Sequence, residues 1–219
     1  MPEIVLMSDP KIAAIPVVDC GEPLLDVRLH EPFPIDMDAR RNDASGAFAH
    51  LRKGVLTRLL DAQKLLPDGI RLLFVEGYRP LALQGSYFKG YADELRSDNP
   101  DWTPEQLRAA ASRYVSPPEI APHSAGAAVD LTLITADGQE LDMGTRVNAN
   151  PEESEGACYT AAPNIGPEAR ANRQLLTETL TAVGLVNYPT EWWHWSYGDR
   201  YWALATGADH AVYGPRELA

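Results

Sequence analysis

Cysteine is almost missing from this chain of 219 residues, which contains only Cys20 and Cys158. Neither residue lies in a Cys-x2-Cys or Cys-His spacing, which argues against a metal site built on thiolates. Two thiols in a chain of this size are typical of a reduced, cytoplasmic protein, and the sequence leaves open whether they pair.

Long apolar runs and a basic leader are also missing. No stretch reaches the ~20 apolar residues that a membrane helix requires. The apolar run at the N-terminus is interrupted early and carries no positive charge before it, unlike a signal peptide. We therefore expect a cytoplasmic location and no contact with a membrane.

Positive charge is in deficit, with 19 Lys and Arg against 31 Asp and Glu, which leaves a formal net charge of −12. Nucleic acids and anionic membranes bind basic surfaces, so the charge argues against both as partners. The acidic surplus does not identify a cationic substrate, because such a surplus is more often a solubility feature.

Three hydrolase motifs are absent from the chain. It has no His-Glu-x-x-His pair on a helix, no Gly-x-Ser-x-Gly nucleophile elbow and no Gly-rich phosphate loop before a helix. A helix-borne zinc site of the thermolysin type and the α/β-hydrolase reaction are thereby excluded.

Hydrophobic residues make up 45% of the chain, enough for one core, and the length suits a single domain over residues 1–219. Residues 1–43 are expected to be irregular, because prolines spread over 10–34 prevent long helices, with a short extended piece at 15–18. These prolines are Pro10, Pro16, Pro23, Pro32 and Pro34.

Helices and strands follow from hydrophobic spacing and from residues that begin or end helices. A helix is expected over 43–66, a buried strand over 70–75 and a helix from Pro80 to about Arg96. Thr103 and Gln106 form a capping box that begins another helix, expected to reach about Val115.

The second half of the chain predicts a central strand over 127–134, a tight turn at Asp137-Gly138 and a long loop over 143–166. That loop is expected to lie over the functional site. A helix is expected over 167–183, ended by Gly184, and strands over 191–205. The result is an α+β domain with a mostly antiparallel central sheet flanked by helices.

Two segments carry the candidate chemistry: His123-Ser-Ala-Gly-Ala-Ala-Val-Asp130 and Glu191-Trp-Trp-His194. Two imidazoles and one carboxylate are the three protein ligands of a catalytic zinc site, whose fourth position is left for water. His123, Asp130 and His194 would leave the Zn²⁺ complex with a charge of +1, which lowers the pKa of bound water toward about 7.

Two further side chains are candidates for the other groups that a hydrolytic reaction needs. Glu191, three residues before His194, is predicted to accept the proton of the water as general base. Arg79, in Glu76-Gly77-Tyr78-Arg79-Pro80, lies at a strand-to-helix junction and is predicted to hold the oxyanion of the tetrahedral intermediate.

Simpler interpretations stay open for each residue. Arg79 could be an ion-pair partner of Glu76, and Glu191 could be a fourth ligand or could orient a histidine. Gly126 could serve only to let two backbones approach. The tryptophans Trp192, Trp193, Trp195 and Trp202 are expected in the core and cleft walls. The other histidines, His30, His50 and His210, are expected at the surface.

The motifs occur in the order Gly77-Tyr78-Arg79-Pro80, His123-x-x-Gly126-x-Ala128-x-Asp130 and Glu191-Trp192-Trp193-His194. This combination resembles the VanX-like D-alanyl-D-alanine dipeptidases. These belong to a wider group of zinc peptidases with D,D-carboxypeptidases, phage endolysins and the hedgehog signalling domain.

The resemblance implies that His123, Asp130 and His194 bind zinc, that Glu191 is the base and that Arg79 stabilises the oxyanion. It also implies the hedgehog/D,D-peptidase-like α+β fold and a short dipeptide as substrate, D-Ala-D-Ala foremost, cut in a confined pocket.

Two positions depart from the family pattern. Ala121 stands where the family usually has Ser, and Asn148 stands where an acidic residue receives the substrate ammonium group. Losing that carboxylate removes a charge-assisted hydrogen bond. The acidity of the loop motivates the hypothesis that Glu152, Glu153 or Glu155 supplies the missing charge.

Two alternative functions remain beside a zinc dipeptidase. One is a cell-wall peptide carboxypeptidase or amidase of the same fold, which the missing secretion signal disfavours. The other is a zinc-stabilised binding module without turnover, which the presence of both Glu191 and Arg79 disfavours.

Overall fold

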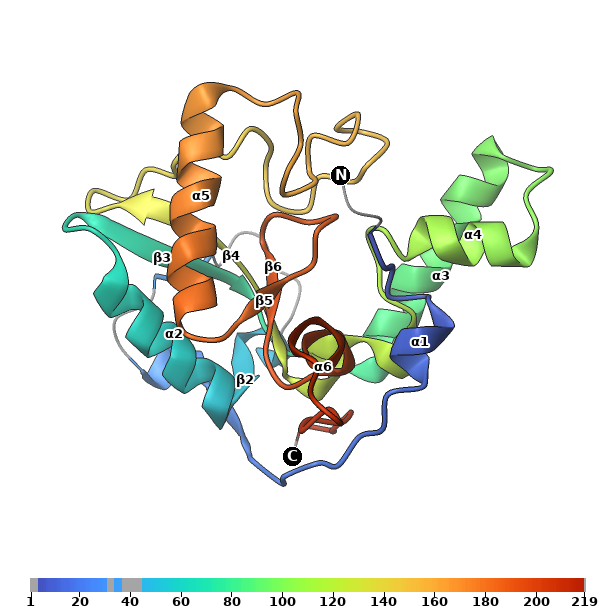
Figure 1. Cartoon of the computed structure of the whole chain (residues 1–219), viewed down its shortest axis with the longest axis horizontal. Helices are drawn as coiled ribbons and strands as arrows, with labels where there is room; N and C mark the ends of the chain where they lie inside the picture. Colours follow the sequence, from blue (N-terminus) through green and yellow to red (C-terminus); the bar gives the residue numbers. More distant parts are fainter. Residues whose placement is uncertain (1–3, 31–33, 37–44, 219) are drawn as a thin grey trace.

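The computed structural model describes residues 4–30, 34–36 and 45–218, and a four-stranded sheet lies at its centre (Figure 1). In spatial order its strands are β3 (Ile70–Glu76), β4 (Ala128–Thr135), β6 (His194–Ser196) and β5 (Val186–Asn187). Every neighbouring pair is antiparallel. The predicted α+β fold with a central antiparallel sheet is therefore confirmed.

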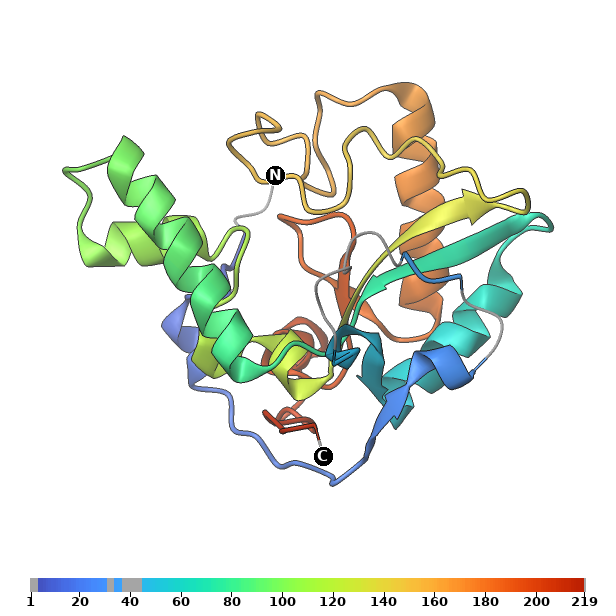
Figure 2. The same cartoon turned by 180° about the vertical axis from the view of Figure 1, so that it is seen from behind.

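Two helices, α2 (Lys53–Leu65) and α5 (Pro167–Ala182), cover one face of this sheet, as both views show (Figures 1 and 2). Leu59 of α2 and Leu176 of α5 are buried in the same apolar cluster as Leu131 of β4. Burial of these apolar helix stripes is the main stabilising contribution to the fold.

A helical hairpin of α3 (Leu81–Asp98) and α4 (Pro104–Ala111) lies on the opposite side of the molecule from α2 and α5 (Figure 2). It has its own small core, to which Tyr91, Leu95 and Leu107 contribute. The hairpin therefore forms a separate wall beside the sheet.

Short elements connect these parts. They are α1 (Pro10–Ala13), α6 (Arg200–Thr206), the paired strands β1 (Leu24–Asp26) and β2 (His50–Arg52), and the 3₁₀ helices η1 (Val27–Leu29), η2 (Ala47–Ala49), η3 (Pro118–Ile120) and η4 (Pro122–Ala125). Val17, in the piece expected to be extended, bridges to Ala211.

Most predicted elements are confirmed, and so is the capping box. The Thr103 hydroxyl accepts from the Gln106 backbone N–H, and the Gln106 side chain accepts from that of Thr103. The helix that it begins ends at Ala111 rather than near Val115. Gly184, at φ +84°, follows α5 as expected.

The prediction that a helix begins at residue 43 is wrong. Residues 43 and 44 lie outside the described part, and η2 and β2 occupy 47–52, so that α2 begins at Lys53. The carbonyls of Phe48 and His50 accept hydrogen bonds from the backbone of Gly77 and Tyr78. These long-range bonds override the helical spacing.

The prediction of strands over 191–205 is also partly wrong. Only His194–Ser196 is a strand there, and the aromatic segment after it forms α6. The Asp199 carboxylate accepts hydrogen bonds from the backbone of Tyr201 and Trp202 and so begins this helix.

The loop over 143–166 is held in place by Arg173 of α5. Its buried guanidinium donates from Nε to the Met143 carbonyl at 2.8 Å, from Nη1 to that of Tyr159 at 2.7 Å and from Nη2 to that of Ala157 at 2.8 Å. Burial lowers the pKa of Arg173 to about 10. Arg173 thus links the start of the loop to its segment 157–159.

Cys20 and Cys158 are both free thiols, the first exposed and the second buried. Trp192, Trp193 and Trp195 lie in the main core as expected, and Trp202 is half-buried. His30 is exposed, whereas His50 and His210 are half-buried. Among the described helices, none combines the length and apolar character needed to cross a membrane.

Candidate metal centre and its cavity

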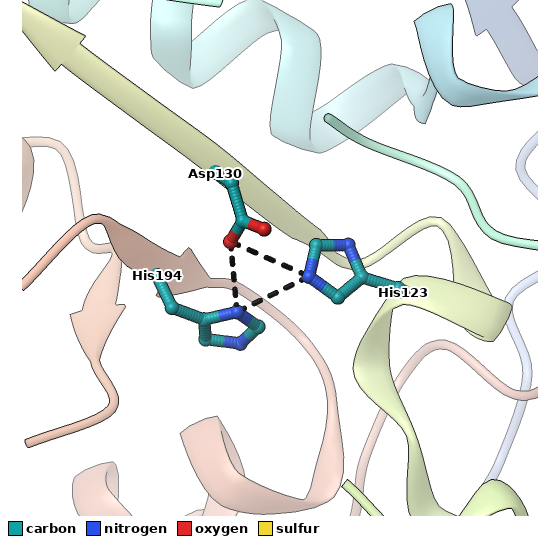
Figure 3. Close-up of side chains that lie close together, drawn as sticks. All are labelled: His123, Asp130 and His194. Atoms are coloured by element: carbon teal, nitrogen blue, oxygen red, sulfur yellow. Dashed lines mark hydrogen bonds and ion pairs between the residues drawn. The ribbon is translucent and has the colours of Figure 1, made fainter. Parts of the chain in front are cut away.

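His123, Asp130 and His194 lie together, although two come from neighbouring strands and one from η4 (Figure 3). His194 Nδ1 is 3.0 Å from Asp130 Oδ1, and His123 Nε2 is 3.4 Å from the same oxygen. The two ring nitrogens are 3.2 Å apart. All three side chains are buried. The predicted ligand set is therefore brought to one point.

Strand pairing explains half of this convergence. Asp130 of β4 lies directly opposite His194 of β6 in the antiparallel ladder, so both side chains leave the same face of the sheet. Glu76 of β3 lies on the other side of Asp130, after a register shift that follows Phe74.

His123 is placed by backbone contacts. Its Nδ1 lies 2.6 Å from the Gly77 carbonyl, and because a carbonyl only accepts, Nδ1 carries the proton and Nε2 the lone pair. Gly126 ends η4 in the left-handed region, at φ +64°, where a Cβ would collide with Leu24. Gly126 thus permits close approach of two segments, as expected.

This donor set fits a divalent metal ion. The lone pair of His123 Nε2 faces the Asp130 carboxylate, and two acceptors in that position repel unless a cation lies between them. Burial alone would raise the pKa of Asp130, but His123 and His194 outweigh it and hold that pKa well below its usual range. Burial lowers the pKa of His194, which favours the neutral imidazole that binds metal.

Glu191 lies beside the three candidate ligands without joining them. Its Oε2 is 3.8 Å from His194 Nδ1, and the described group with metal-ligand geometry contains only the other three residues. Burial and then repulsion from Asp130 raise the pKa of Glu191 well above its usual value, although Arg79 opposes this. The position suits a base next to the ion better than a fourth ligand.

Arg79 forms the ion pair with Glu76 that the sequence left open. Its Nε donates to Glu76 Oε1 at 2.9 Å and its Nη2 to Oε2 at 2.5 Å, while Nη1 donates to Gln84 Oε1 at 2.9 Å. The guanidinium also lines the cavity above the metal centre. The ion pair therefore orients Arg79 toward the site, and the two interpretations are compatible.

A cavity of about 440 Å³ opens from this centre. Its walls come from α3, from the segment after α4, from the 143–166 loop and from the turn before β6. The lining residues are Arg79, Gln84, Ser86, Tyr87, Gly90, Tyr91, Glu94, Tyr114, Val115, Ser116, His123, Asp130, Asn148, Asn150, Glu191 and His194.

The 143–166 loop is tied to the helical hairpin beside this cavity. The Tyr114 hydroxyl donates to the Asn148 carbonyl at 3.0 Å, and Glu152 accepts from both Tyr91 and Arg113. Burial raises the pKa of Tyr114 to about 12, so this hydroxyl stays a donor at neutral pH. These contacts bring Asn148 and Asn150 into the cavity wall.

The hypothesis that Glu152, Glu153 or Glu155 replaces the missing carboxylate is wrong, because none of the three lines the cavity. Glu152 accepts hydrogen bonds from Tyr91 and Arg113, and Glu153 pairs with Arg146 at 2.8 Å. Ala121 is buried.

Sequence reasoning missed Gln84, which holds Arg79 through Oε1 and donates from Nε2 to the Ser116 carbonyl at 2.7 Å. Its position could have indicated this role, because Gln84 lies in the first helical turn after Arg79 and on the same face of α3 as Tyr91, seven residues later.

The sequence pattern of the D-Ala-D-Ala dipeptidase family matches residues 43–212. The chain belongs to this family. It is similar to a D-alanyl-D-alanine dipeptidase of Synechocystis sp., with 31% identity and 90% of each chain covered. It is also similar to the D-alanyl-D-alanine dipeptidase of Escherichia coli K12, with 29% identity over 66% of this chain and 64% of that one.

Among solved structures, the chain is similar to VanYB in complex with D-alanine-D-alanine, with a TM-score of 0.46 and 18% identity over 75% of this chain and 81% of that one. The predicted enzyme class, a metallopeptidase that acts as a dipeptidase, is confirmed by membership of the D-Ala-D-Ala dipeptidase family.

Proposed function

We propose that this dipeptidase hydrolyses D-Ala-D-Ala with zinc held by His123, Asp130 and His194. The convergence of these three donors beneath a cavity that Glu191 and Arg79 also line is the observation that carries the proposal. Two imidazoles and one carboxylate suit zinc better than magnesium or calcium, which prefer oxygen ligands. When bound, zinc supplies a Lewis acid for the scissile carbonyl and lowers the pKa of water.

Glu191 acts as the general base in this proposal. Its carboxylate takes a proton from the attacking water and gives it to the nitrogen of the leaving D-Ala. A raised pKa suits both steps, because the group must bind the proton and then release it. The confined position beside His194 brings the carboxylate to the reacting atoms.

Arg79 donates hydrogen bonds to the oxyanion that forms on the scissile carbonyl. Glu76 and Gln84 hold its guanidinium before substrate binds, so little reorganisation is needed during the reaction. We expect Arg79→Met to lower kcat for D-Ala-D-Ala by about 10²–10³-fold, the usual loss for one oxyanion donor.

A coupled assay of D-Ala release measures this loss, and Arg108→Met is the control, because Arg108 lies on α4 outside the cavity and pairs with Glu119. An Arg79 variant whose kcat stays within twofold of the unchanged protein would refute the oxyanion role.

The first test of the function is D-Ala release from D-Ala-D-Ala by the purified protein, together with its metal content. We expect hydrolysis and about one zinc ion per chain, because the described residues provide one complete ligand set. The rate of hydrolysis of an N-acylated D-Ala-D-Ala, compared with that of the free dipeptide, measures the effect of blocking the ammonium group. Absence of D-Ala in the presence of added zinc would overturn the assignment.

We also propose that residues 1–219 act as one peptidase domain in the cytoplasm, with the 143–166 loop over the active site. The contribution of Asn148 and Asn150 to the cavity wall supports the role of the loop. The two free thiols are consistent with a reducing compartment.

A further inference from the structure

The segment that joins β5 to β6 carries two groups that the proposed reaction needs. Glu191 lies in its turn and His194 begins β6, and the two strands pair at Asn187 and Trp195 (Figure 1). Glu191 Oε2 is 3.8 Å from His194 Nδ1. A shift of this turn would therefore move the base relative to the metal centre, so the contacts that hold the turn bear on the reaction.

One side chain, Asn187 at the end of β5, bridges the backbone of both groups. Its Nδ2 donates to the Glu191 carbonyl and to the His194 carbonyl, each at 3.0 Å. Its Oδ1 accepts a hydrogen bond from the Thr160 hydroxyl. Both amide hydrogens and the amide oxygen are thus engaged, which fixes the orientation of the side chain.

The two carbonyls also belong to a closed set of backbone hydrogen bonds. The His194 N–H donates to the Glu191 carbonyl at 3.2 Å, and the Tyr188 N–H donates to the His194 carbonyl at 3.1 Å. A carbonyl oxygen has two lone pairs, and Asn187 occupies the second one on both residues. Its amide therefore ties together the two backbone positions from which the base and the imidazole extend.

Asn187 can affect the reaction only through these neighbours. Glu191 and His194 line the cavity, whereas Asn187 does not. Thr160 anchors the amide from the 143–166 loop, since its own N–H also donates to the Pro189 carbonyl at 3.0 Å. The amide is therefore held from behind, on the side away from the substrate.

We propose that Asn187 is a positioning residue, whose amide sets the place of the base Glu191 relative to the imidazole of His194. The inference rests on the proposed function of the metal centre. A misplacement of about 1 Å can cost about 10²-fold in rate. Residues that hold a metal ligand from behind usually contribute about 10–100-fold to activity or metal affinity.

The test compares Asn187→Asp with Asn187→Ala in the zinc-loaded protein. Asn187→Asp keeps the volume and the acceptor for Thr160, but it sets an oxygen against two carbonyls. It is expected to lower kcat for D-Ala-D-Ala by about 10–100-fold and to leave KM within about twofold, because Asn187 does not line the cavity. Asn187→Ala should lose less, since it removes the donor without adding this repulsion.

This order of the two variants separates positioning from packing. If Asn187 only fills space, Asp is the milder replacement, because it has nearly the same volume and Ala does not. Thr160→Val leaves Asn187 in place but removes the hydroxyl that orients its amide. It should lower kcat by about two- to tenfold, the usual effect of one hydrogen bond.

Hydrogen exchange in the metal-free protein gives a second measurement that does not depend on turnover. Asn187→Asp should speed the exchange of backbone N–H groups in the segment 188–194 by about tenfold, because the turn opens more often without the two amide bonds. Exchange in β3, which does not contact Asn187, should stay unchanged and serves as the internal reference.

Asn164→Asp is the matched control. Asn164 also donates from Nδ2 to a backbone carbonyl, that of Glu155, but it is exposed and does not line the cavity. This variant should change neither kcat nor exchange in the segment 188–194.

An Asn187→Asp variant that keeps kcat within about twofold, or that loses less than Asn187→Ala, overturns the inference and leaves the proposed function intact. If Asn187→Asp does not fold, Thr160→Val decides, and an unchanged kcat in that variant overturns the inference. If the unchanged protein hydrolyses no D-Ala-D-Ala, the proposed function fails and exchange decides separately. Faster exchange in the segment 188–194 would then support the role of Asn187, and unchanged exchange would refute it.

Discussion

Glu191→Gln is expected to lower kcat for D-Ala-D-Ala by about 10²–10⁴-fold, the range for loss of a general base, while the zinc content stays unchanged. Gln has nearly the same shape but cannot accept a proton at neutral pH. Since Glu191 lies outside the group of three ligands, its replacement leaves all three donors in place. Steady-state kinetics and metal analysis of the same preparation measure both quantities.

Thermal unfolding of the metal-free protein separates loss of the base from loss of the fold. The pKa of Glu191 is raised by burial and by Asp130, so this group lowers the stability of the folded state progressively as the pH rises above the ordinary pKa of a glutamate. Glu191→Gln should therefore raise the unfolding temperature of the metal-free protein at neutral pH.

A matched variant, Glu178→Gln on the exposed face of α5, should change neither activity nor metal content, because Glu178 accepts a hydrogen bond from Gln174 and does not line the cavity. The base assignment is wrong if Glu191→Gln turns over D-Ala-D-Ala normally. A loss of zinc from this variant would instead make Glu191 a ligand.

Removal of the metal is expected to abolish hydrolysis, and added Zn²⁺ should restore it. Without the ion, the remaining groups have no Lewis acid for the carbonyl and no means of activating water at neutral pH. Chelation followed by titration with Zn²⁺ or Mg²⁺ tests the choice of metal. Zn²⁺ should restore activity and Mg²⁺ should not, because two of the three donors are imidazole nitrogens.

Binding of the ion should also stabilise the fold, because the three donors belong to η4, β4 and β6 and are brought together only by folding. At a free Zn²⁺ concentration of about 1,000 times Kd the gain is about 4 kcal/mol. His123→Ala should lose this stabilisation, whereas Glu191→Gln should keep it. A chelated enzyme that remains fully active, or a His123→Ala variant still stabilised by Zn²⁺, contradicts the assigned ligands.

Local chemistry explains why much of the site could be predicted. His123, Asp130, His194, Glu191 and Arg79 were found from side-chain types and spacing, and the structure places all five around one cavity. Asp130 and His194 converge because short antiparallel strands put paired residues on one face. Helix ends were predictable where a side chain contacts its own backbone, as at Thr103.

Errors arose where distant backbone decided the local structure. Residues 47–52 were predicted to be helical, yet 50–52 pair with β1, and the carbonyls of Phe48 and His50 accept hydrogen bonds from Gly77 and Tyr78. In the tail, the aromatic-rich composition favoured strands, but the Asp199 cap produces a helix. The acidic loop suggested a substrate carboxylate, but Arg113 and Arg146 already hold two of its glutamates.

By itself the sequence predicted a candidate ligand set and a candidate general base, since these depend on chemical type and on spacing within two short segments. Only the tertiary structure decided what surrounds that centre. The role of Gln84 behind Arg79, and the contribution of α3 to the cavity wall, depend on where α3 lies beside the sheet. That placement comes from the packing of α3 against α4 and the segment after it, contacts that no local pattern contains.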